Sequence, residues 1–72
     1  MFYSISYFKP DKSLAYVDSR TFTKVNNALI RAALHIQAHH EELRRANIIY
    51  QGKHVQKVVR SIAVLNPEPK FQ

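Results

Sequence analysis

One apolar stripe in the middle of the chain constrains the fold more than any other feature. Its members recur at alternating spacings of three and four residues: Phe22, Val25, Leu29, Ala32, Ile36, His39, Leu43 and Ala46. This spacing places side chains on one face of an α-helix. The stripe therefore predicts one helix over about residues 23–46. Thr21 or Thr23 would cap its start. Arg44 and Arg45 would lie in its last turn, where cations are favoured.

The segment before the stripe predicts a β-hairpin. Residues 2–8 alternate in polarity and are rich in aromatic residues, which favour strands. Lys9-Pro10-Asp11-Lys12 has the composition of a turn, because proline fixes φ and aspartate bonds to nearby backbone. Residues 14–18 would then form the second strand. On the first strand, Tyr3, Ile5 and Tyr7 would share one face, which leaves Phe2 and Phe8 on the other.

The segment after the stripe is compatible with two structures. Residues 48–51 predict a strand, and Gly52-Lys53 a tight turn after it. The β-branched residues in the stretch 55–64 favour a fourth strand and a second hairpin. However, Val55, Val58, Val59 and Ile62 also have helical spacing. A C-terminal helix is therefore the alternative.

Together these elements predict one small α+β domain over residues 1–66. The expected order is ββαββ, an antiparallel sheet with the long helix across one face, and the alternative is ββαβα. Pro67 and Pro69 interrupt regular structure, so residues 67–72 are expected to form a flexible tail.

Composition limits the compartment and the chemistry. The chain has no cysteine, which excludes disulfides, thiolate metal sites and cysteine nucleophiles. It also has no apolar run long enough to span a membrane, and residues 1–8 do not have the pattern of a secretory signal. We therefore expect a cytoplasmic protein with no membrane partner.

Positive charge is the main indication of function. The net charge is +6, and the run from Leu43 to Pro67 contains no acidic residue. Clustered cations favour a polyanionic partner. The sequence therefore predicts a small protein that binds DNA or RNA, as a regulator or accessory factor. The predicted phosphate contacts are Arg44, Arg45, Lys53, Lys57 and Arg60. The alternative is an interaction module, an inhibitor or adaptor, that binds an acidic protein through the same surface.

Aromatic residues add to this hypothesis. Several lie on the predicted strands beside lysines, and Phe2 and Phe8 would face away from the helix. Exposed rings on a sheet can stack on bases while lysines hold phosphates. The same rings could instead fill a small core or a dimer interface.

Catalytic and metal chemistry have little support. His35, His39 and Glu42 would project along one helix stripe and could hold a divalent metal. Ile36 follows His35 where the zinc-protease helix has glutamate, and solvated or interfacial histidines are the simpler interpretation. The serines lack a nucleophile-elbow context. We expect no enzyme activity, no catalytic residue, no metal and no cofactor.

Two aliphatic residues lie off the main stripe. Ile30 and Leu34 would be exposed on the helix, and the predicted helix would be roughly 36 Å long at 1.5 Å per residue. Exposed aliphatic surface often marks a partner contact. Ile30 and Leu34 are therefore the predicted interface of a homodimer.

Overall fold

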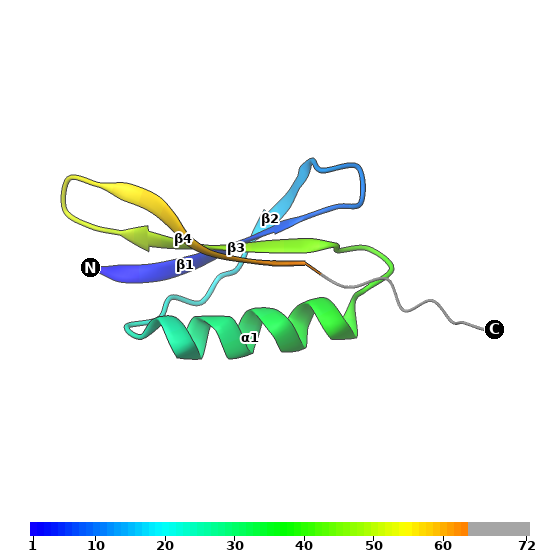
Figure 1. Cartoon of the computed structure of the whole chain (residues 1–72), viewed down its shortest axis with the longest axis horizontal. Coiled ribbons are helices and arrows are strands. Elements are labelled where there is room, and N and C mark those ends of the chain that lie inside the picture. The colour runs from blue at the N-terminus through cyan, green and yellow to red at the C-terminus, as the bar shows by residue number, and fades with distance from the viewer. Residues whose placement is uncertain (64–72) are drawn as a thin grey trace.

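The structure, a computed structural model, describes residues 1–63. Its elements are β1 (Phe2–Phe8), β2 (Leu14–Val17), α1 (Val25–Ala38), β3 (Arg45–Gln51) and β4 (Gln56–Ala63). The four strands form one antiparallel sheet in the order β2-β1-β3-β4, and α1 lies along one face of it (Figure 1). The predicted α+β class and ββαββ order are confirmed. The predicted domain end at residue 66 and the tail 67–72 lie outside the described residues.

The last described element is a strand, so the alternative of a C-terminal helix is wrong. Gln56–Ala63 pairs with Arg45–Gln51 along its whole length. The register shifts between Ile48 and Ile49, because β4 contains one extra residue there. The β-branched residues of this segment therefore follow their strand preference rather than their helical spacing.

The core lies between the sheet and α1. Ile5 and Tyr7 of β1 and Ile48 of β3 are fully buried, and they meet Ala32 and Ile36 of the helix. Burying a large apolar side chain contributes about 1.5–3 kcal/mol. The sheet face toward α1 is thus the hydrophobic face, as the alternation along β1 predicted.

The helix is shorter than predicted. It begins at Val25, after Lys24 as N-cap, and no side chain of the described residues caps it, so the expected caps Thr21 and Thr23 are wrong. It ends at Ala38, because His39 leaves helical geometry and its N–H donates to the carbonyls of His35 and Ile36. No helix among residues 1–63 is both long and apolar enough to cross a membrane.

The end of the apolar stripe belongs to other elements. Leu43 is buried from a turn and Ala46 from β3. The chain leaves the helix because Arg45–Gln51 pairs residue for residue with the whole of β1 and also with β4. The backbone hydrogen bonds that this segment makes to β1 and β4 take the place of those that a longer helix would have made. Arg44 and Arg45 therefore do not lie at a helix end.

The face of the sheet away from α1 is open within the described part of the chain. Cross-strand partners share a face, and Tyr3, Ile5 and Tyr7 pair with Tyr50, Ile48 and Ala46 on the helix side. Phe2 and Phe8 therefore lie on the open face, as expected. Between them Ser4 and Ser6 are 7% exposed, and the Ser4 hydroxyl accepts a hydrogen bond from the Gln51 side chain at 2.9 Å.

Candidate nucleic-acid interface

The turn between β1 and β2 has an unusual backbone. Lys9 and Lys12 close it, with the Lys12 N–H donating to the Lys9 carbonyl at 2.9 Å, and Pro10 lies between them. Lys12 has φ 76°, the left-handed region that costs a non-glycine residue roughly 1–3 kcal/mol. Hairpin loops of this kind usually have glycine at such a position. A lysine is thus held in a conformation that its own backbone disfavours.

The same turn forms one wall of a pocket. The pocket has a volume of about 510 Å³ and is called here the basic pocket; it is lined by Phe8, Lys9, Pro10, Lys12, Arg44, Arg45 and Ala63. Four of the described lining residues are cations and none is acidic. Nearby Asp11 accepts hydrogen bonds from the N–H and hydroxyl of Ser13, which lower the pKa of its carboxyl. The four cations give the pocket a positive potential, which the ionised Asp11 carboxylate beside it partly offsets.

Backbone pairing fixes the two arginines of the basic pocket. Arg44 donates its N–H to the Phe8 carbonyl at 2.9 Å, and Arg45 pairs with Phe8 across the β1–β3 ladder. The Arg45 guanidinium donates to the Ser61 hydroxyl at 2.7 Å, and that hydroxyl donates to Asn47 at 2.9 Å. One of its five N–H donors is thus used for orientation, and the planar group is pre-positioned to bind an anion.

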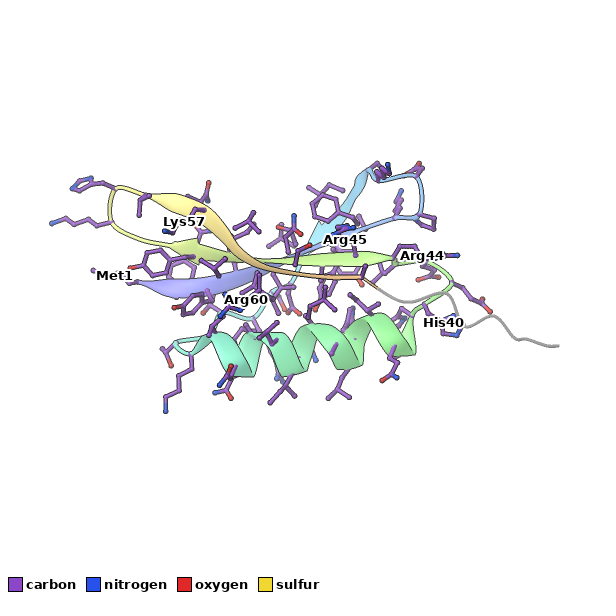
Figure 2. The ribbon with its side chains drawn as sticks, in the orientation of Figure 1. Met1, His40, Arg44, Arg45, Lys57 and Arg60 are labelled. Atoms are coloured by element: carbon purple, nitrogen blue, oxygen red, sulfur yellow. The ribbon has the colours of Figure 1, made fainter. Side chains whose placement is uncertain are left out.

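The structure brings only two of the five predicted phosphate contacts together. Arg44 and Arg45 lie in the basic pocket, whereas Lys53 lies in the turn between β3 and β4. Lys57 and Arg60 pair with Tyr50 and Ile48, so they lie on the helix side of the sheet, on its outermost strand. Figure 2 shows Lys57 and Arg44 toward opposite ends of the molecule.

The five predicted phosphate contacts do not include Lys9 and Lys12, although both are among the lysines beside the aromatic residues of the predicted strands. Both flank Pro10 in the turn, and Asp11 between them obscured the positive charge. They lie far from Arg44 and Arg45 in sequence, and only the pairing of Phe8 with Arg45 brings the two groups together. The available signal was the lysine at the end of a proline-containing turn, where glycine is more usual.

A second polar cluster lies on the helix side of the sheet. The Asp18 side chain is 3% exposed, and its carboxylate accepts hydrogen bonds from the Tyr7 hydroxyl at 2.8 Å, the Arg31 Nε at 3.1 Å and the Arg20 N–H at 2.9 Å. Burial raises the pKa of Asp18, but these three bonds and the Arg31 charge outweigh burial and hold it below its usual value. Burial and the bond to Asp18 raise the pKa of Tyr7.

His35 links this cluster to the surface. Its Nε2 lies 2.7 Å from the hydroxyl of Tyr16, and its ring centroid is 4.6 Å from that of Tyr7 and 4.6 Å from that of His39. Burial, and then the charges of His39 and Arg31, lower the pKa of His35. The lowered pKa favours the neutral imidazole, which packs against Tyr7 and lies within hydrogen-bonding distance of the Tyr16 hydroxyl.

The structure does not assemble the three residues considered for a metal. His35 and His39 lie in contact, but α1 ends at Ala38, so Glu42 is not on the helix stripe. Residues 1–63 contain no group of three or more histidine, aspartate or glutamate side chains arranged to hold a metal ion.

The predicted dimer contact remains a surface feature. Ile30 is 59% and Leu34 62% exposed, one turn apart on the outer side of α1. The excess helix length that supported a dimer is absent, since the helix has 14 residues. Only the exposed aliphatic pair still supports that hypothesis.

Comparison of the chain with protein-family models, curated proteins and solved structures finds no match.

Proposed function

We propose that this protein binds nucleic acid through the basic pocket. The observation that carries the proposal is the convergence of four cations from two distant segments around one aromatic ring. Lysine and arginine neutralise phosphates and release condensed counterions, which drives binding without sequence preference. The protein would act as a cytoplasmic regulator or accessory factor.

Two local features support a ligand in this pocket. The Arg45 guanidinium is oriented by Ser61, and a planar, oriented guanidinium matches the oxygens of a phosphate. Lys12 occupies a left-handed turn position where glycine would be less strained. A disfavoured conformation that presents a cation to a pocket suggests that the charge serves binding rather than folding.

The most direct test replaces Lys12 with glycine. We expect Lys12→Gly to leave the free energy of unfolding unchanged or to raise it by up to about 1 kcal/mol, because glycine tolerates positive φ. Binding should weaken nonetheless. In a salt titration with duplex DNA, the slope of log K against log salt should become less steep by about 0.9.

Lys57→Gln is the matched control, because it removes one lysine charge at the other end of the molecule. It should change the slope by much less than Lys12→Gly. If Lys57→Gln has the larger effect, binding is centred on the β3–β4 hairpin and the basic pocket is not the site. If neither DNA nor RNA is bound at low salt and micromolar concentration, the proposal fails, and an acidic protein becomes the partner to seek.

A further inference from the structure

Three hollows follow one another around one end of the sheet. The basic pocket shares Lys9 and Pro10 with a second hollow of about 390 Å³, which Ala15, Tyr16, Glu42 and Leu43 complete. Tyr16 also lines a third hollow of about 410 Å³, together with Val17, Asp18, Ser19, Arg31 and His35. Each hollow shares at least one lining residue with the next, and the three together are called here the track.

The far end of the track has a positioned cation. Arg31 donates its Nε to the buried carboxylate of Asp18, which the Tyr7 hydroxyl and the Arg20 N–H hold in place. A guanidinium has five N–H donors, and the Asp18 contact uses the Nε one. Arg31 lines the hollow, and its remaining N–H donors can therefore bind a phosphate oxygen.

The middle of the track suits a base rather than a phosphate. Tyr16 is 45% exposed, and its hydroxyl is fixed by the 2.7 Å bond to His35, which orients the ring. Pro10 and Ala15 add apolar surface, whereas Glu42 repels phosphate. An oriented aromatic ring in an apolar hollow is a stacking platform.

The two ends of the track lie on different sides of the sheet. Phe8 and Arg45 belong to the open face, whereas Tyr16 pairs with Tyr7 and contacts His35 on the helix side. A ligand in contact with both cationic ends must bend sharply over a few residues. Duplex DNA is stiff over about 150 base pairs, but a single strand bends freely.

We infer that the track binds single-stranded nucleic acid, with one phosphate at the basic pocket, a base against Tyr16 and a further phosphate at Arg31. This inference rests on the proposed function and adds its ligand class. A duplex can contact only the basic pocket.

The test compares two probes at one salt concentration: oligothymidylate of about 12 nucleotides and a duplex of equal length. This length lies within the ~4–16 nucleotides that single-strand sites span. We expect the single strand to bind at least about tenfold tighter. Tyr16→Leu should weaken single-strand binding by about 5–150-fold, the equivalent of losing one stacked base, and leave duplex binding unchanged. Tyr16→Phe keeps the ring and should retain single-strand binding.

Arg31→Gln tests the distant phosphate contact. It should make the single-strand salt slope less steep by about 0.7 and leave the duplex slope unchanged. Lys24→Gln, an exposed charge change at the start of α1, is its control, and thermal unfolding checks that each variant is folded. If both probes bind with equal affinity and Tyr16→Leu changes neither affinity, the inference about the track is wrong. The proposal for the basic pocket is then unaffected. If neither Lys12→Gly nor Tyr16→Leu weakens binding, both proposals are wrong.

Discussion

The Tyr7 hydroxyl offers the sharpest test of what stabilises this fold. Tyr7 is fully buried, and its hydroxyl donates to Asp18 at 2.8 Å. Tyr7→Phe removes that one oxygen and keeps the ring, so the contacts with Tyr16 and His35, at centroid distances of 5.3 and 4.6 Å, are preserved. Asp18 also keeps its bonds from Arg20 and Arg31. The change therefore isolates one hydrogen bond.

The expected cost follows from the charge of the acceptor. A hydrogen bond to a charged group contributes about 1.5–3 kcal/mol. At about 4–8 °C per kcal/mol for a domain of this size, the Tm of Tyr7→Phe should fall by about 6–24 °C. Asp18→Ala should cost more, because it removes three bonds and leaves a buried hydroxyl without its acceptor. Urea unfolding at pH 7 measures both differences.

The pKa shifts predict how the cost depends on pH. The folded pKa of Asp18 is lowered, so its stabilisation is present above the unfolded value near 3.9 and is lost as pH falls through the folded pKa. The folded pKa of Tyr7 is raised, so its contribution is present below about pH 10 and is lost as pH rises beyond that. The difference between wild type and Tyr7→Phe should therefore shrink below about pH 4 and above about pH 10.

Two outcomes would refute this reasoning. A cost below about 0.5 kcal/mol at pH 7 would mean that the buried bond contributes little beyond what water supplies in the unfolded chain. A cost that stays constant as the pH falls from 7 through the lowered folded pKa of Asp18 would mean that the ionised form of Asp18 is not what the hydroxyl stabilises. Either result would mean that the Tyr7 hydroxyl does little to hold the ionised Asp18 carboxylate in place beside Arg31.

Two further predictions concern packing and association. Ile36→Ala should cost about 2–5 kcal/mol in urea unfolding, because Ile36 is 1% exposed between helix and sheet; a cost below about 1 kcal/mol would contradict the core described here. If Ile30 and Leu34 form a homodimer contact, Leu34→Glu should yield monomer in sedimentation with unchanged helical circular dichroism. A wild-type protein that remains monomeric at hundreds of micromolar would contradict the dimer hypothesis.

Periodicity predicted the elements better than their limits. The alternation along residues 2–8 identified a strand and its buried face, because one side of a sheet strand must face the core. The stripe from Phe22 to Ala46 overestimated the helix, since Leu43 and Ala46 are buried from a turn and a strand. Apolar residues recur wherever the chain returns to the core, so spacing alone could not locate the end at Ala38.

The candidate site was less predictable because it depends on strand pairing. Arg44 and Arg45 were named from charge, but their neighbours Lys9 and Lys12 come from a different hairpin. Lys57 and Arg60 belong to the same acid-free run as Arg44, yet strand pairing, with the extra residue of β4 between them, turns both to the helix side. The position of a charged residue in the sequence does not by itself determine on which face of the sheet its side chain lies.

The order of strands also has a consequence for how the chain folds. β1 and β2, and likewise β3 and β4, are hairpins joined by short turns, whereas the central pairing of Phe2 with Gln51 joins residues nearly a whole domain apart. Loop-closure entropy makes such non-local contacts slow to form. We therefore expect the two hairpins to form early and their docking through β1 and β3 to limit the folding rate. Since the basic pocket is built from one segment of each hairpin, it comes into existence only at that step.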